Sequence, residues 1–235
     1  MKLKHINEIK KNETPPMVKK IFNDKEIADL LDLYKSLPVT VHNKKQNVIK
    51  KRWLQNYNKI LDEMYLSKLQ EVLGNFKMDN LKSENDEDFF GLFQESFGPI
   101  KLHSDSGFDE NSIIYKQTLV PLTPYGETVI FDNRWYENST SFTIDKEELN
   151  EKITKKGMNA RSNKHLILYG KNDFDSFDHE KYLKHIDINN LKGLKILMVY
   201  KWKIGDILIF DRTLLHSSSC NIKTHKIGLT TFTKK

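Results

Sequence analysis

The sequence predicts an α+β fold that is dominated by β-strands. From residue 89 onward, short apolar runs bounded by Gly and Pro replace the helical period, which is typical of antiparallel strands. One long polar interruption divides these runs into two groups, and two amphipathic helices are expected before them. Seven or eight short strands arranged in this way predict a two-sheet jelly roll, a double-stranded β-helix of the cupin type, with helices packed outside it. A length of 235 residues fits a single domain.

Residues 1–88 are expected to form a helical support region for the sheets. A short strand is expected at residues 18–22. Asn23 and Asp24 then offer caps for a helix whose apolar positions recur at helical spacing before Pro38 ends it. This helix should pack on the sheet through its apolar face.

A second amphipathic helix is expected over residues 57–73, with Gly74 as its C-terminal signal. The basic stretch before it, residues 44–52, is expected to be turn-like. Residues 80–88 are polar and acidic, and a loop is expected there.

The jelly-roll core is expected to comprise residues 89–132 and 194–235. Within it, strands are expected at residues 89–93, 112–122, 127–132, 194–202, 207–210, 214–216 and 226–233. Residues 133–193 form an insertion, with a helix expected at residues 145–156. This insertion is a candidate lid or substrate-binding region.

The composition is that of a soluble globular protein, with 38% hydrophobic and 30% charged residues. The net charge of +6 comes almost entirely from lysine, because the chain has only four arginines, so it does not favour a nucleic-acid reader. No run approaches membrane-spanning length, and the N-terminus lacks the apolar core of a signal peptide. The single cysteine, Cys220, cannot form an internal disulfide. A cytoplasmic location is therefore predicted.

A candidate metal site begins at His103-Ser104-Asp105. Residues i and i+2 of an extended backbone point to the same side, so the imidazole and the carboxylate can converge on one cation. His216, at the end of a later predicted strand, is the candidate third donor. Two histidines and one carboxylate form the facial triad that holds Fe(II) with coordination positions left open. The other histidines precede the predicted sheets, lie in the insertion or adjoin Lys226.

Lys226 follows His216 by ten residues and begins an apolar predicted strand. A lysine directed into a narrow barrel is costly without an anion to pair with it. Lys226 therefore either faces solvent or binds a carboxylate.

A family resemblance joins these features. The order of His103-x-Asp105, His216 and a basic residue ten positions later resembles the Fe(II)- and 2-oxoglutarate-dependent oxygenases, as do the segments at residues 126–131 and 205–210. The resemblance extends from about residue 89 to the C-terminus. Many members carry Arg at this basic position, and the lysine resembles the prolyl 4-hydroxylase branch.

The resemblance implies an iron-dependent hydroxylase. His103, Asp105 and His216 would hold Fe(II), while Lys226 and Thr128 would bind the distal carboxylate of 2-oxoglutarate, and O2 would be the second cosubstrate. The implied reaction is hydroxylation of a substrate C–H bond with release of succinate and CO2.

Three further residues are expected near the cosubstrate. Tyr115 and Gln117 share a face of their predicted strand, and Ser218 lies two residues beyond His216. The substrate, whether a small molecule or a peptidyl group, is not identified by any motif.

Two alternatives lie outside this class. A cupin-like metalloenzyme that does not use 2-oxoglutarate predicts the same metal ligands with Lys226 pointing outward. A non-catalytic jelly-roll binding protein would use the same fold as a platform, without need of the ligands.

Overall fold

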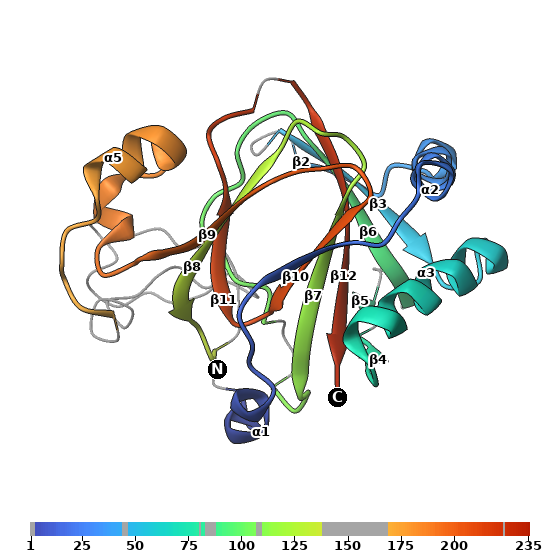
Figure 1. Cartoon of the computed structure of the whole chain (residues 1–235), viewed down its shortest axis with the longest axis horizontal. Coiled ribbons are helices and arrows are strands. Elements are labelled where there is room, and N and C mark those ends of the chain that lie inside the picture. Colours follow the sequence, from blue (N-terminus) through green and yellow to red (C-terminus); the bar gives the residue numbers. More distant parts are fainter. Residues whose placement is uncertain are drawn as a thin grey trace.

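The architecture was examined in a computed structural model, which describes residues 3–43, 47–79, 81–82, 88–106, 110–137, 169–222 and 224–235. Two antiparallel sheets face one another (Figure 1). The larger sheet contains β1 (Met17–Lys20), β2 (Val41–Asn43), β3 (Val48–Leu54), β4 (Lys77–Met78), β5 (Leu81–Lys82), β6 (Asp88–Ser96), β7 (Ile114–Pro121), β10 (Asp206–Asp211) and β12 (Lys226–Lys234). The smaller sheet contains β8 (Glu127–Arg134), β9 (Ile196–Lys201) and β11 (Leu214–Ser218).

The strand order gives the chain its jelly-roll character. The larger sheet runs β1-β10-β7-β12-β6-β3-β2, and the smaller sheet runs β11-β8-β9. Strands that precede the insertion (β6, β7 and β8) therefore alternate in each sheet with strands that follow it (β9 to β12), as in a double-stranded β-helix. The mainly β, two-sheet architecture expected from the sequence is confirmed.

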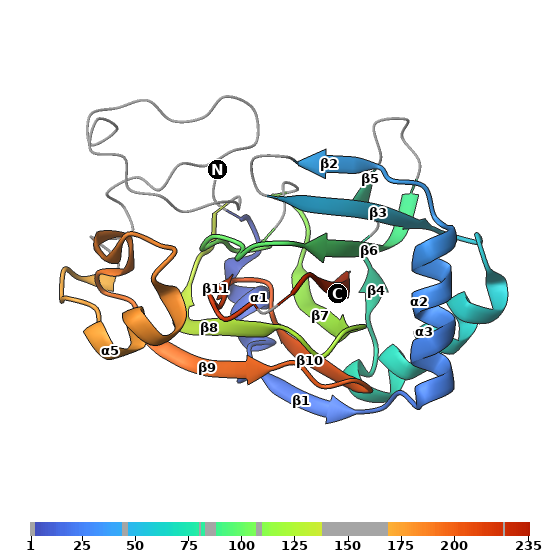
Figure 2. The same cartoon turned by 90° about the horizontal axis from the view of Figure 1, so that it is seen from above.

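Helices α2 (Asp24–Ser36) and α3 (Lys59–Leu73) lie outside the larger sheet, at the end opposite α5 (Ser176–Asp178) (Figures 1 and 2). Asn23 and Glu26 form a capping box at the start of α2, because each side chain accepts a hydrogen bond from the other residue's backbone. The apolar faces of both helices join one core cluster with the sheet, which includes Leu30, Leu69, Trp53 and Phe93. The short helix α1 (Ile6–Lys11) precedes β1.

The hairpin of β2 and β3 corrects part of one expectation: residues 48–52 of the stretch predicted to be turn-like lie in β3, whereas residues 44–46 lie outside the described residues. β3 pairs with β6 over seven residues, and its Val48 and Trp53 are fully buried. Lys51 points toward α2, where its amine donates to the backbone oxygen of Tyr34 at 2.8 Å. Lys50, one residue earlier, faces the opposite side of the sheet.

The insertion packs against the smaller sheet through the part of it that the structure describes. Residues 169–193 contain α5, a π-helical turn (His179–Leu183) and a 3-10 turn (Ile188–Leu191). Phe174, Leu183 and Leu191 share a buried cluster with strand residues of β8 and β11. The helix expected at residues 145–156 lies outside the described residues.

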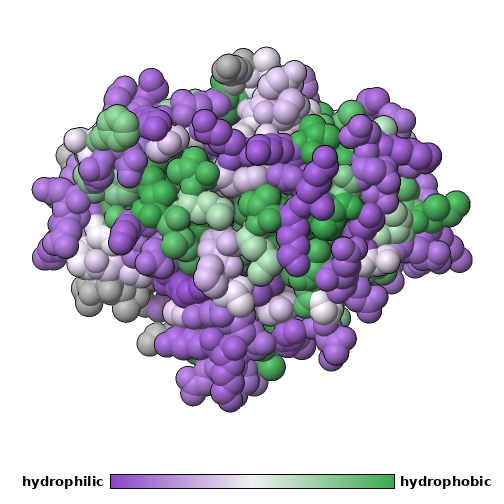
Figure 3. Space-filling model, in the orientation of Figure 1, coloured by the Kyte–Doolittle hydropathy of each residue, from purple (hydrophilic) through white to green (hydrophobic). Residues whose placement is uncertain are grey.

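The molecular surface mixes polar and apolar groups. On the face shown in Figure 3, hydrophilic residues separate patches of hydrophobic ones. Within the described ranges, no helix has both the length and the apolar character needed to cross a membrane.

Candidate metal centre

The three candidate ligands are brought together by a backbone bridge between segments distant in sequence. His103 and His216 face each other as an antiparallel pair, and each backbone N–H donates to the other's carbonyl at 2.9 Å. Asp105 follows two residues after His103, and its backbone oxygen accepts a hydrogen bond from Arg212 Nε at 2.8 Å. Arg212 is fully buried and forms an ion pair with Asp79. The Asp105 segment is thus held in place by a buried cation.

The donor atoms of the three side chains converge. One carboxylate oxygen of Asp105 lies 3.3 Å from His216 Nε2 and 3.9 Å from His103 Nε2, and the three donor atoms all lie within 4.8 Å of one another. The Nδ1 atom of each histidine contacts a backbone carbonyl two residues earlier in the chain, Lys101 at 2.7 Å and Leu214 at 3.0 Å. With Nδ1–H donating to a carbonyl, the Nε2 lone pair of each ring faces the centre. This is the arrangement found around metal-bound histidines.

The electrostatics of the group favour the metal-binding protonation state. Burial lowers the pKa of His103 to about 4, with the neighbouring His216 contributing in the same direction. Burial alone would raise the pKa of Asp105, but its close contact with His216 and the nearby Arg212 guanidinium hold that pKa well below its usual range. A neutral imidazole and an ionised carboxylate are the forms that bind a divalent cation.

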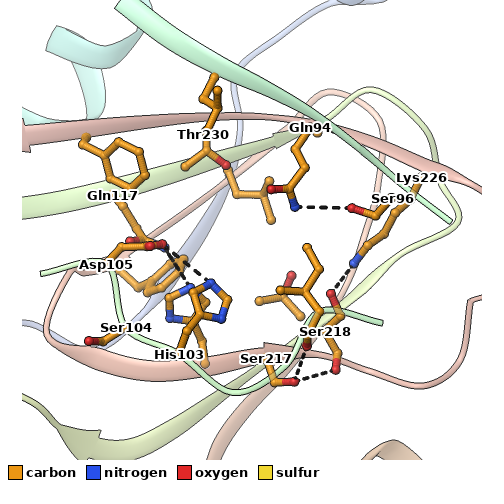
Figure 4. A pocket seen from close by; sticks show the side chains of 18 of the residues that line it. Gln94, Ser96, His103, Ser104, Asp105, Gln117, Ser217, Ser218, Lys226 and Thr230 are labelled. Atoms are coloured by element: carbon orange, nitrogen blue, oxygen red, sulfur yellow. Dashed lines mark hydrogen bonds and ion pairs between the residues drawn. The ribbon is translucent and has the colours of Figure 1, made fainter. Parts of the chain in front are cut away.

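A cavity of about 370 Å³ adjoins the three ligands. The side chains of His103 and Asp105 are 24% and 27% exposed, whereas that of His216 is 7% exposed, so the group opens on one side. Figure 4 shows His103 and Asp105 on one side of this cavity and Lys226 with Ser218 on the other. A cation held by the triad would therefore face the cavity with coordination positions free.

Lys226 points into the cavity. Its strand, β12, lies between β6 and β7, so the lysine is not on a sheet edge, and only 3% of the residue is exposed. Its amine donates to Ser218 Oγ at 2.6 Å and lies 4.7 Å from the ring centroid of Trp202. Burial lowers its pKa to about 7, against the opposing effect of Glu127. Among the described residues, no carboxylate forms an ion pair with this amine.

Thr128 and Gln117 line the same cavity, as expected. The Thr128 hydroxyl accepts a hydrogen bond from Trp202 Nε1 at 2.9 Å, which places it beside the ring that Lys226 contacts. The Gln117 amide donates from Nε2 to His216 Nε2 at 3.2 Å, and its buried Oε1 atom has no partner in the described part of the chain. The side chain therefore contacts a candidate metal ligand through its nitrogen and keeps its oxygen unpaired.

Tyr115 does not line the cavity, which corrects the expectation that it shares the face of Gln117. Its hydroxyl donates to the backbone oxygen of Leu73 at 3.5 Å, on the side of α3. The pairing of β7 with β12 is irregular between Phe232 and Lys234, at the level of Tyr115. One extra residue in β7 at this bulge interrupts the alternation of side chains.

The cavity residues that sequence reasoning missed include two basic ones, Lys50 and Arg212. Lys50 lies in the stretch that was expected to form a turn. The available signal was the apolar Val48, which is buried and shares a face of the strand with Lys50 two residues later. For Arg212 no local signal existed, because its burial depends on Asp79 and on strands distant in sequence.

Comparisons with known proteins identify the fold. No family model and no curated relative matches the sequence. An oxidoreductase of the 2OG-Fe(II) oxygenase family from Burkholderia pseudomallei aligns over 97% of this chain and 89% of its own, with 9% identity and a TM-score of 0.50. HygX from Streptomyces hygroscopicus, with nickel and 2-oxoglutarate bound, aligns over 99% and 87%, with 11% identity and a TM-score of 0.51. The epimerase SnoN, in complex with Fe3+, alpha ketoglutarate and nogalamycin RO, aligns over 99% and 83%, with 8% identity and a TM-score of 0.54. The chain shares its fold with these proteins.

Proposed function

We propose that this protein is an Fe(II)- and 2-oxoglutarate-dependent oxygenase that hydroxylates a C–H bond of a small-molecule or peptidyl substrate. One observation carries the proposal: the facial group of His103, Asp105 and His216 opens on a cavity whose opposite side holds a buried lysine, Lys226. A metal chelated by one end of 2-oxoglutarate and a cation for the other end are the two parts that this cosubstrate requires.

The metal ligands fit a divalent cation by their chemistry. Two imidazoles and one carboxylate on one face match the donor set that binds Fe(II) and leaves positions for other ligands. The carbonyls that orient both rings would keep them in place whether or not the metal is bound. Two structures of the same fold contain nickel or iron together with this cosubstrate.

Lys226 fits the distal carboxylate of 2-oxoglutarate because it is buried without a carboxylate of its own. A charged amine in this position would form a charge-assisted hydrogen bond with an incoming anion. The hydroxyls of Ser218 and Thr128 lie beside it and can donate to the same carboxylate. The inward direction of Lys226 also favours this proposal over a cupin-like enzyme that does not use 2-oxoglutarate.

The chain's own residues would bind, orient and shield the reactants. With iron and 2-oxoglutarate bound, O2 would be activated to attack a substrate C–H bond, with succinate and CO2 as the other products. Trp202 and Phe210 line the cavity and are almost fully buried, so they exclude water from the side where 2-oxoglutarate would lie. Gln117 would orient groups bound next to His216.

Anaerobic titration of the purified protein with Fe(II) and 2-oxoglutarate tests the proposal. A weak visible charge-transfer band should appear only when both are present, because it arises from the chelate. His216→Ala should abolish the band by removing one metal ligand. Metal binding without the band would favour an enzyme that does not use 2-oxoglutarate, and absence of metal binding would exclude the enzyme.

A further inference from the structure

Lys50 is a charged cavity residue that the proposed chemistry does not use. It lies on β3, directly opposite Gln94 of β6, and both residues line the cavity. β3 is separated by β6 from β12, the strand that carries Lys226. Lys50 therefore belongs to a different part of the cavity wall from the lysine assigned to 2-oxoglutarate.

The environment of Lys50 lacks a dedicated anionic partner. Burial lowers its pKa, and Asp105 is the nearby group that opposes this effect. Asp105 is itself a candidate metal ligand, so its charge would be neutralised by the cation. In the described part of the chain, no carboxylate lies within ion-pair distance of the Lys50 amine.

The balance of charge around the cavity leaves Lys50 uncompensated. Asp105 is the only acidic side chain among the described lining residues, whereas Lys50, Lys101, Arg212 and Lys226 are basic. A divalent metal and doubly charged 2-oxoglutarate cancel each other in formal charge. Arg212 is already ion-paired, and Lys226 would hold the cosubstrate. Lys50 within the wall and the exposed Lys101 at its rim would remain positive.

The surroundings of Lys50 are suited to a small organic anion. Gln94 Nε2 donates one of its two N–H groups to Ser96 Oγ at 3.3 Å on the same wall, and the second N–H can donate to a bound anion (Figure 4). Leu92 and Leu119 supply apolar surface nearby. Because the cavity of about 370 Å³ must also hold 2-oxoglutarate, the remaining space fits a small molecule or one side chain.

We propose that Lys50 binds a carboxylate of the substrate, so that the enzyme oxidises a small organic acid. This inference rests on the proposed function, because it places the substrate beside the metal. A single amine with one amide N–H next to it matches a singly charged carboxylate, whereas a phosphate is usually bound by several donors. The bound acid would direct its apolar part along the leucines, toward the metal ligands.

Matched acids and amides test this assignment in protein loaded with Zn(II) and saturating 2-oxoglutarate. The probes are butyrate with butyramide and benzoate with benzamide, which differ chiefly in charge. Affinity is measured by ligand-observed NMR, and access to Lys50 by reductive methylation and peptide mapping. The acids should bind and protect Lys50 from methylation, whereas the amides should do neither.

The variants Lys50→Gln, Lys50→Arg and Lys101→Gln provide the controls. Lys50→Gln should weaken binding of the acids by about tenfold or more, because a charge-assisted contact is lost. Lys50→Arg, which keeps the charge, should retain binding, and Lys101→Gln should resemble the wild type. Equal binding of acids and amides, no binding of either, or unchanged affinity in Lys50→Gln would overturn the inference.

The same samples separate this inference from the proposed function. Zinc content and 2-oxoglutarate binding are measured by equilibrium dialysis before the probes are added. If the wild-type protein binds no zinc or no 2-oxoglutarate, the proposed function is refuted and this inference with it. Normal loading without selectivity for acids would refute only the role of Lys50, as would tighter binding of inorganic phosphate than of both acids.

Discussion

Replacing Lys226 with Met is expected to stabilise the metal-free protein while weakening its affinity for 2-oxoglutarate. The lysine is 3% exposed, and burial lowers its pKa from 10.5 to about 7. Methionine keeps an unbranched, flexible side chain of similar length but carries no charge. The substitution therefore removes the cost of burying the ammonium group together with the function proposed for it.

The magnitude follows from the pKa change of Lys226. One pKa unit corresponds to about 1.4 kcal/mol, so a shift from 10.5 to about 7 costs the folded state about 5 kcal/mol when the amine is charged in both states. The variant also loses the hydrogen bond to Ser218, worth about 1 kcal/mol, and the cation–π contact with Trp202, worth about 2 kcal/mol. The net gain in unfolding free energy should be about 2 kcal/mol.

The sign of the pH dependence distinguishes this cause from a general packing effect. Between the folded pKa of about 7 and the unfolded pKa of 10.5, the unfolded state binds more protons at Lys226. The unfolding free energy of the wild type therefore rises with pH through this window. The Met variant lacks this contribution, so its advantage is largest below about pH 7 and should fall by about 3 kcal/mol by about pH 9, where the variant is no longer more stable than the wild type.

Urea unfolding in the presence of EDTA measures the effect at both pH values. Lys101→Met is the matched control, because Lys101 lies exposed at the rim of the cavity and should change stability little. In zinc-loaded protein, Lys226→Met should weaken 2-oxoglutarate binding by about 2 kcal/mol or more. A Met variant that is less stable than the wild type at low pH, or whose stability difference does not vary with pH, would refute the reasoning.

Three further substitutions test contacts of the fold by urea unfolding. Gly126→Ala would place a Cβ atom 2.5 Å from the ring of Trp202, so we expect a loss of about 1–3 kcal/mol and altered tryptophan fluorescence. Lys116→Met leaves Asp211 buried without one of its cationic partners, so we expect a loss of about 3 kcal/mol. Asn23→Ala removes the N-cap of α2 and should cost about 1 kcal/mol. For each variant, a urea unfolding midpoint equal to that of the wild type would contradict the role assigned to the contact.

The candidate metal group could be predicted from the sequence, although local geometry relates only two of its three ligands. His103 and Asp105 need only an extended backbone to share a side, and His216 lies within a strand that its apolar neighbours predict. The direct backbone pairing of the two histidines could not be predicted, since it depends on how the sheets fold together. The same holds for the inward direction of Lys226, which requires β12 to lie inside the sheet.

The sequence-based expectations for β3 and Tyr115 were wrong because strand pairing with distant segments outweighs the conformational preference of the local residues. β3 contains three consecutive basic residues, which are depleted in isolated strands, yet seven of its residues pair with β6. The long stems of Lys50 and Lys51 allow their amines to reach the cavity and α2 from opposite faces. For Tyr115, a bulge that no local residue signals reversed the side on which its ring lies.

The insertion was expected to be a lid or substrate-binding region, and residues 138–168 of it lie outside the described residues. No residue of its described part, 169–193, lines the cavity. Leu102 and Leu215, each one residue before a candidate metal-binding histidine, instead pack with Phe174 and Leu183 of the insertion. Because side chains alternate along an extended backbone, burying these leucines on the outer side directs both histidines inward. Residues 169–193 thus support the candidate metal ligands from behind, whereas Lys50, proposed to bind the substrate, belongs to β3 of the other sheet.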